Sequence, residues 1–172
     1  YTFPVNTFAD TDAADTLSYT ANQSDGSALP GWLSFDGTSR TFSGTPGNDD
    51  VATSTLRVTA TDKFTGTVTD DFLMTVVNVN DDPFFTSTAV TAATAGTAYT
   101  YSVTAEDIDV GDVLSLSGAT LPSWLTLTDN GDETATLSGT PTNSNAGANA
   151  VVLQVSDGTT TANQTFDVTV TA

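Results

Sequence analysis

The sequence contains no cysteine and no histidine, and it has almost no positive charge. Its 172 residues include 3 basic and 21 acidic side chains, for a net charge of −18. Without His or Cys there is no Ser-His-Asp triad, no Cys-His pair and no ordinary zinc site. The negative charge repels phosphate backbones and anionic lipid surfaces, which excludes nucleic acid as a partner. No apolar run approaches the roughly 18 residues of a spanning helix, so we expect no membrane insertion.

The acidic residues are almost all aspartate, since Glu106 and Glu133 are the only glutamates. A halophilic surface and a set of calcium sites both explain a large negative charge. A halophilic surface would use Asp and Glu about equally, whereas here Asp recurs in short motifs. The pattern therefore favours calcium.

The strongest signal in the chain is an internal repeat. Five landmarks recur in the same order at offsets of 92 to 97 residues. They are Asp-x-Asp-x-x-Asp-x-Leu (10–17 and 107–114), Leu-Pro-x-Trp-Leu (29–33 and 121–125), Ser-Gly-Thr-Pro (43–46 and 138–141), the single aspartates Asp62 and Asp157, and the apolar runs 72–76 and 166–170. The chain is a tandem array of two units.

Each unit has the pattern of a β-sandwich. Residues 56–60, 72–79, 151–155 and 165–170 alternate or are β-branched, and no segment keeps a helical apolar period. About seven short strands in about 90 residues predict an immunoglobulin-like sandwich, with Trp32 and Trp124 in the cores. Asn130-Gly131 predicts a hairpin turn between Asp129 and Asp132. Asp70-Asp71 is interpreted as a solvated loop before a strand.

A short polar stretch that ends in Pro83 separates the units, so we expect domains over residues 1–80 and 81–172. Aligning Tyr1–Phe3 with Tyr99–Tyr101 leaves the first unit short of roughly 15 residues, about one opening strand. Either that strand lies outside the given sequence or a different segment supplies it.

In combination, these motifs and the Asn-x-Asn-Asp-x-Pro linker resemble the dystroglycan-type cadherin-like domain. Overlapping definitions describe this domain as an immunoglobulin-like repeat of bacterial surface proteins. The resemblance covers nearly the whole chain. It implies an all-β fold of two Greek-key sandwiches joined by a short calcium-binding linker, with residence in secreted or surface proteins. Similar repeats occur in giant adhesins and in some polysaccharide-degrading enzymes.

The resemblance also assigns calcium ligands at the junction between the units. They are Asn78, Asn80 and Asp81 in the linker, Asp107 and Asp109 in the Asp-x-Asp motif, Asp157 at a strand end, and Asp49 and Asp50 at the lower end of the first unit. The first unit repeats part of this set as Asp10, Asp12 and Asp62, for which we expect a weaker or partial site. The second unit has no acidic counterpart of Asp49-Asp50, so a site below it is not expected.

The residues themselves explain why such a site would need a cation. Two Asp spaced by two residues point the same way in an extended segment, so one ion can bridge them. No basic residue lies within ten positions of Asp107 or Asp157 in the sequence, and clustered carboxylates repel one another. Calcium binding is therefore preferred over a merely solvated acidic surface, and catalysis is not expected.

The function indicated is that of a calcium-rigidified spacer in a large extracellular, bacterial adhesin, with neighbouring domains as partners. Two alternatives stay open. One is a polysaccharide-binding module of an enzyme or adhesin, with the aromatic candidates Phe84, Phe85, Tyr99 and Tyr101. The other is homophilic adhesion by strand exchange, because an open sheet edge pairs readily. Extracellular polysaccharide and another cell-surface protein are the corresponding partners that stay open.

Overall fold

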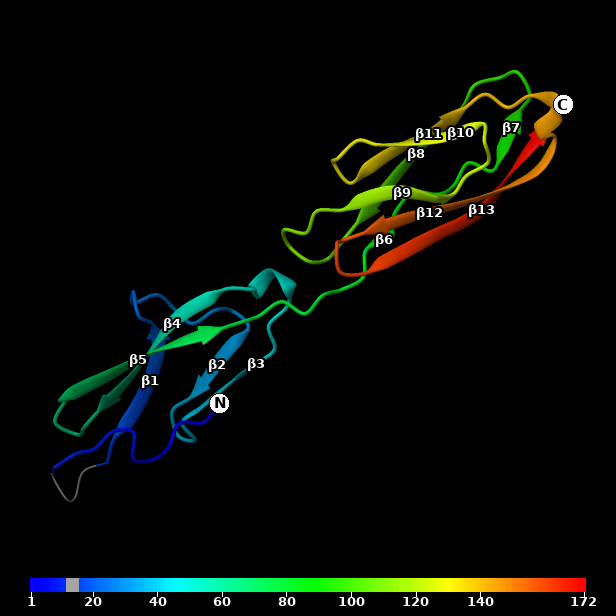
Figure 1. The fold of residues 1–172 in the computed structure, drawn as a ribbon. Coiled ribbons are helices and arrows are strands. Elements are labelled where there is room, and N and C mark those ends of the chain that lie inside the picture. The colour runs from blue at the N-terminus through cyan, green and yellow to red at the C-terminus, as the bar shows by residue number, and fades with distance from the viewer. Residues whose placement is uncertain (12–15) are drawn as a thin grey trace. The chain divides into compact units, whose positions relative to one another are not determined.

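The computed structural model describes residues 1–11 and 16–172, in two compact units that comprise Tyr1–Asn78 and Val79–Ala172 (Figure 1). Asp12, one of the predicted ligands, lies outside the described residues. Both units consist of strands and one short 3-10 helix each, which confirms the predicted all-β class. Among the described residues, no helix is long and apolar enough to cross a membrane.

Unit 2 is a sandwich of two four-stranded sheets, with orders β10-β11-β8-β6 and β7-β13-β12-β9. Its strands are β6 (Phe84–Phe85), β7 (Ala92–Thr94), β8 (Tyr99–Glu106), β9 (Ser115–Thr120), β10 (Leu125–Asp129), β11 (Thr134–Gly139), β12 (Gly147–Ser156) and β13 (Thr161–Thr171), with the 3-10 helix η2 (Asn143–Asn145) before β12.

Unit 1 has the sheets β1-β4-β5 and β2-β3, and an isolated bridge joins Thr2 to Thr41. Its elements are β1 (Ser18–Gln23), β2 (Leu33–Asp36), β3 (Thr41–Gly44), the 3-10 helix η1 (Asn48–Asp50), β4 (Thr53–Thr61) and β5 (Thr67–Thr75). Its described residues include no counterparts of β6 and β7.

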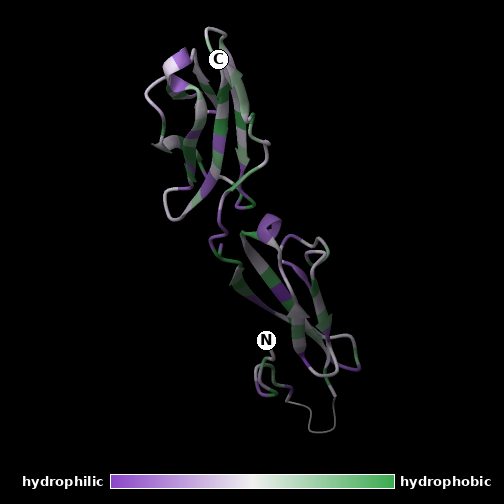
Figure 2. Cartoon of the chain, turned by 90° about the vertical axis from the view of Figure 1, so that its right-hand side faces the viewer, coloured by the Kyte–Doolittle hydropathy of each residue, from purple (hydrophilic) through white to green (hydrophobic). Residues whose placement is uncertain are grey.

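Alternation of apolar and polar residues along the strands builds one core in each unit (Figure 2). In unit 2 the fully buried side chains come from both sheets, among them Val103, Leu137, Leu153 and Val168. In unit 1 the core is more aromatic: Phe3, Phe8 and Phe42 are buried and pack with the partly buried Tyr19 and Phe35. The strands therefore bury one face each, as the period of two predicted.

Two of the repeat motifs contact each other in both units. Gly44 and Gly139 belong to the two Ser-Gly-Thr-Pro motifs, and they pair with the leucines that directly follow Trp32 and Trp124. A Cβ at either glycine would fall on the backbone carbonyl of the tryptophan in its own unit. The glycine is therefore required by this close approach, which explains why the two motifs occur together.

The two tryptophans do not have the same role. Trp124 is partly buried against the core, and its indole N–H donates to Asn149 Oδ1 at 3.1 Å. Trp32 is also half-buried, but it lines a cavity of about 190 Å³ with Asp49, Asp50 and Ser54 rather than packing in the unit 1 core. The prediction of a core anchor holds for Trp124 and is wrong for Trp32.

Strand β5 differs from its prediction. The strand covers Thr67–Thr75 rather than residues 72–79, so Asp70 and Asp71 lie within it and not in a loop. Asp71 pairs with Arg57 of the neighbouring strand, with Nε to Oδ1 at 2.7 Å. The cross-strand arginine accounts for an acidic residue in a strand, and the sequence does not display that pairing because it joins residues 14 apart.

The register of the repeat at the start of unit 1 is shifted by two residues from the sequence alignment. Tyr1 exchanges backbone hydrogen bonds with Phe42, both at 2.8 Å, whereas in unit 2 Tyr101 pairs with Leu137. Since Phe42 and Leu137 both directly precede Ser-Gly-Thr-Pro, Tyr1 is the counterpart of Tyr101 and not of Tyr99. A slip of two residues keeps every side chain on the same face, so the sequence pattern did not distinguish the two registers.

Candidate metal centre

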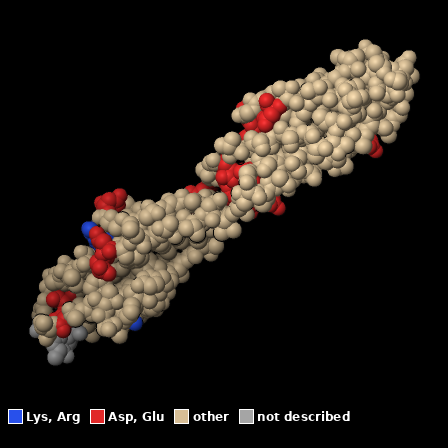
Figure 3. Space-filling model, in the orientation of Figure 1, with Lys and Arg blue, Asp and Glu red and all other residues tan. Residues whose placement is uncertain are grey.

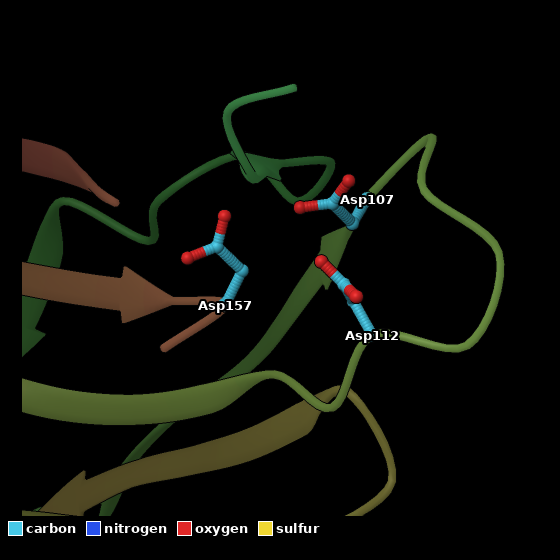
Figure 4. Close-up of side chains that lie close together, drawn as sticks. All are labelled: Asp107, Asp112 and Asp157. Carbon is cyan, nitrogen blue, oxygen red and sulfur yellow. The ribbon is translucent and has the colours of Figure 1, made fainter. Parts of the chain in front are cut away.

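Three carboxylates of unit 2 converge at one end of its sandwich. Asp107 directly follows β8, Asp112 lies in the loop between β8 and β9, and Asp157 directly follows β12. One oxygen of each lies within 4.8 Å of the others, and the three side chains face a common space (Figure 4). On the face that Figure 3 shows, the Asp and Glu side chains form several separate patches rather than an even distribution.

Asp109 shapes the loop that carries two of these acids. It is 4% exposed, its N–H donates to Asp107 Oδ1 at 2.9 Å, and its Oδ2 accepts from the backbone N–H of Asp81 at 2.8 Å. The first bond fixes the turn after Asp107. The second ties the linker residue Asp81 to the loop, so a buried carboxylate connects two segments of the predicted ligand set.

Asp157 closes the β12–β13 hairpin and also reaches the linker. Its Oδ1 accepts from the backbone N–H groups of Thr159 and Thr160, both at 2.6 Å, and its Oδ2 accepts from Asn80 Nδ2 at 2.9 Å. The hydrogen bond from Asn80, followed by those from Thr160 and Thr159, lowers the pKa of Asp157 to about 2. These bonds stabilise the charged form, so Asp157 is ionised at neutral pH.

Asp112 and one oxygen of Asp107 lack such hydrogen bonds. Desolvation, and then repulsion from Asp109, Asp107 and Asp157, raises the pKa of Asp112 above its usual value. Asp107 Oδ2 is buried and has no hydrogen-bond partner among the described residues. Residues 79–172 contain no Lys, Arg or His, so no side chain of unit 2 can neutralise this group.

An all-oxygen donor set of clustered carboxylates suits a hard divalent cation, above all Ca²⁺, which takes six to eight oxygen ligands. A cation would supply the partner that Asp107 Oδ2 lacks and would relieve the repulsion at Asp112. The residues present therefore fit the predicted ion.

Of the sequence-predicted ligands, the structure brings together Asn80, Asp81, Asp107, Asp109 and Asp157 in unit 2. Asp112 was missed as a ligand although it is the third acid of the Asp-x-Asp-x-x-Asp-x-Leu motif. The signal was therefore visible in the sequence. However, a separation of five residues does not by itself indicate that the loop after β8 folds back and brings Asp112 beside Asp107.

The remaining predicted ligands belong to unit 1. Asp62 closes the β4–β5 hairpin, with Oδ1 accepting from the N–H groups of Phe64 and Gly66, both at 2.8 Å. Asp10 is exposed. Asp50 accepts the N–H of Gly47 at the start of η1, and Asp49 is exposed. Asn78 is the last residue of the unit and is exposed. Within the described part of unit 1, no three acidic groups converge as they do in unit 2.

The aromatic candidates for sugar binding have different environments. Tyr99 and Tyr101 are 5% and 3% exposed and belong to the core, so they cannot form a platform. Phe85 is half-buried, whereas Phe84 is 41% exposed. β10 and β11 form a hairpin at Asn130-Gly131, as predicted, but the connection covers residues 130–133 rather than a two-residue turn between Asp129 and Asp132. Asp129 accepts the N–H groups of Leu116 and Gly131 there.

Comparison with solved structures places the fold among cadherin ectodomains. Human CDH23 EC21-23 matches with a TM-score of 0.57 and 16% identity, over 90% of this chain and 57% of that chain. Human Protocadherin-24 EC1-2 (form II) matches with a TM-score of 0.52 and 17% identity, over 95% and 84%. These likenesses show the fold alone.

An endo-fucoidan hydrolase from glycoside hydrolase family 107 matches at 29% identity with a TM-score of 0.48, over 88% of this chain. The chain spans 23% of that hydrolase. No curated protein matches at a significant level. The family model described as "Putative Ig domain" matches residues 1–77 and again residues 82–171. The chain therefore belongs to this immunoglobulin-like family and carries two tandem copies of its domain.

Proposed function

We propose that the chain is a calcium-binding structural module of an extracellular protein. The observation that carries this proposal is the convergence of Asp107, Asp112 and Asp157 around a buried carboxylate oxygen without a partner, in a unit that has no basic side chain. A cation satisfies that oxygen and removes the repulsion between the three charges.

The ion would be held by the carboxylates of Asp107, Asp112 and Asp157, with Asp109 as the residue that shapes the loop. Asn80 and Asp81 already contact Asp157 and Asp109 through hydrogen bonds of 2.9 and 2.8 Å. Because these linker residues contact the same group, an ion bound there also orders the chain segment that directly follows unit 1. An ion that binds only the ordered linker stabilises it by mass action.

The module would act as a spacer, whose stiffness depends on calcium, in a secreted or cell-surface protein. In the finer form of this proposal it is a dystroglycan-type cadherin-like pair from a bacterial adhesin, non-catalytic, with the neighbouring domains of the same chain as partners. The cadherin-like fold of both units supports a structural role in an extracellular chain.

Titration calorimetry with Ca²⁺ tests the site. We expect the wild type to bind Ca²⁺ and Asp107→Asn to lose the heat of that binding. Asp167→Asn is the matched control, because Asp167 is an exposed acid on β13 outside the cluster, and it should bind as the wild type does. Equal binding by wild type and Asp107→Asn would exclude this centre as the ligand set.

Small-angle X-ray scattering tests the spacer role separately. In excess calcium the wild type should sample a narrower range of maximum dimensions than in chelator, and Asp107→Ala should not respond to calcium. If the wild type and Asp107→Ala are equally flexible with calcium present, then the ion does not stiffen the linker even where calorimetry shows binding.

The polysaccharide-binding alternative now depends on Phe84, the most exposed of the four aromatic candidates. Binding to a glycan array that is lost in Phe84→Ala but kept in Asp107→Asn would favour it over the spacer.

A further inference from the structure

The two units differ beside the tryptophan of the Leu-Pro-x-Trp-Leu motif. In unit 2 the side chain of Asn149 occupies this place. Its Oδ1 accepts the indole N–H of Trp124 at 3.1 Å, and its Nδ2 donates to the carbonyls of Asn145 and Gly147, both at 2.9 Å. One carboxamide therefore satisfies the indole and occupies the space beside it.

Unit 1 has a serine at the matching position. The register of the β4–β5 pair matches that of the β12–β13 pair, so Ser54, opposite Met74, is the counterpart of Asn149, opposite Val168. Serine is shorter and has no amide, and no hydrogen bond joins the indole N–H of Trp32 to a residue that the structure describes. The space that the amide occupies in unit 2 belongs in unit 1 to the cavity of about 190 Å³.

The two indoles have the same placement in their units. A Cβ added at Gly44 would lie 3.0 Å from Cε3 of Trp32, and one added at Gly139 would lie 3.2 Å from Cε3 of Trp124. The indole N–H of Trp32 therefore has the direction of the one that reaches Asn149 in unit 2, and it faces the cavity. A donor in this position is available to a ligand.

The rest of the cavity wall combines carboxylates with apolar groups. Asp49 and Asp50 of η1 line it, and Asp50 uses Oδ2 to accept the N–H of Gly47 at 2.8 Å. Their counterparts in unit 2 are the neutral Ser144 and Asn145. The apolar lining consists of Pro30, Ala52, Met74 and Val76. The wall thus offers one donor, two acceptor groups and an apolar surface, all from residues of unit 1.

We propose that this cavity binds one ring of a neutral sugar. The carboxylates need a ligand that donates hydrogen bonds, whereas the indole N–H needs one that accepts them. A hydroxyl group does both, while an ammonium group only donates. The C–H groups of a sugar ring suit the indole and the apolar lining, and the net charge of −18 disfavours an anionic glycan. This inference rests neither on the calcium site nor on Phe84.

The size of the cavity limits both the ligand and the affinity. Pockets that enclose drug-sized ligands have about 300–1,000 Å³, whereas this cavity has about 190 Å³. It accommodates a single ring rather than an oligosaccharide. We therefore expect a dissociation constant of about 1–10 mM for a monosaccharide.

Titration with methyl glycosides, followed by NMR of the indole N–H groups, tests this inference. The probes are the methyl glycosides of glucose, galactose, mannose and N-acetylglucosamine, each up to about 100 mM and in chelator. At least one should shift the Trp32 signal to saturation. The Trp124 signal should stay unchanged, because Asn149 already accepts that N–H. Since chelator is present, the result is independent of the proposed calcium site.

The variant Ser54→Asn introduces the amide that unit 2 has in this place. It should fill the cavity, leave the urea midpoint of unit 1 unchanged or higher, and abolish the sugar-dependent shift of Trp32. Thr69→Asn, at an exposed position of β5 outside the cavity, is the matched control and should bind as the wild type does. Asp49→Asn should weaken binding by at least about fivefold, because a carboxylate accepts stronger hydrogen bonds than an amide.

Three results would overturn the proposal. The first is a Trp32 signal that none of the four sugars shifts. The second is an equal sugar-dependent shift in Ser54→Asn, which would place the binding outside the cavity. The third is a shift of Trp32 with methylammonium chloride but not with the sugars, which would identify a cationic ligand instead.

Discussion

Replacement of Asp112 by asparagine separates two effects of the carboxylate cluster on stability. One is the repulsion between the acids when no cation is present, and the other is the stabilisation by bound calcium. Asp112 is the acid whose pKa is raised by desolvation and by its acidic neighbours, so its charge is disfavoured in the folded protein when no cation is present. The amide keeps the shape of the side chain and removes the charge. In chelator, Asp112→Asn should therefore melt at the same temperature as the wild type or at a higher one.

In the presence of calcium, the wild type should have a higher melting temperature than Asp112→Asn. Calcium at about 100 times its dissociation constant adds about 2.7 kcal/mol to the stability of a unit with one site. Unit 2 covers residues 79–172, and for a domain of this size one kcal/mol corresponds to about 4–8 °C. The wild type should therefore gain about 10–20 °C. If the variant binds about 100-fold more weakly, its gain at the same calcium concentration falls to about 2–3 °C.

Thermal unfolding followed by Trp124 fluorescence measures this difference in unit 2 alone, in a background of Trp32→Phe. The magnesium salt at the same concentration serves as the ionic control. An Asp112→Asn variant that melts lower in chelator but keeps the full calcium gain would show that Asp112 is a structural residue and not a ligand.

Three further predictions concern single contacts. In chelator, Asn80→Ala should raise the pKa of Asp157 from about 2 towards 3.8, because the largest cause of the lowered value is lost. The stability that this carboxylate contributes above pH 3.8 should therefore become smaller, and what remains should be lost at a higher pH on acidification; NMR titration of the carboxyl carbon measures the shift. Gly44→Ala should destabilise unit 1 by about 1–3 kcal/mol in urea unfolding because its Cβ falls on a backbone carbonyl, whereas Gly31→Ala, with open space around the added atom, should change little. Asn149→Ala removes the acceptor of the indole N–H and three donated bonds to Asn145, Gly147 and Val168, and should cost unit 2 about 1–3 kcal/mol; an unchanged urea midpoint would contradict that role.

Several features of the fold could be read from the sequence because they depend on local pattern. The period-two alternation in residues 151–155 and 165–170 predicts two strands, and these residues lie in β12 and β13. The five recurring landmarks predict two similar units. Asn130-Gly131 predicts where the β10–β11 hairpin turns, although the connection over residues 130–133 is longer than the two-residue turn that this pair favours. Each of these inferences needs only the identity of residues a few positions apart.

The sequence predicts which residue types form the candidate site, but not every residue that belongs to it. Asp107, Asp109 and Asp157 were identified from motif and resemblance, yet Asp112 was overlooked, because which loop side chains face inward depends on how the chain turns between β8 and β9. Trp32 was misplaced for a similar reason. A tryptophan in a repeated motif predicts a core position, but its burial depends on the neighbours that the other sheet supplies.

The sequence by itself determined that this protein is a tandem pair of β-sandwich units, that it cannot use His or Cys chemistry, and that unit 2 has no basic side chain to neutralise its acids. These properties follow from composition and periodicity. Only the tertiary structure decided that Asp107, Asp112 and Asp157 share one space, that Asp109 ties the linker to their loop, and that Tyr1 stands in the position of Tyr101. Those facts depend on strand register and loop path, which bring together residues up to 50 positions apart and are set by packing of the whole unit.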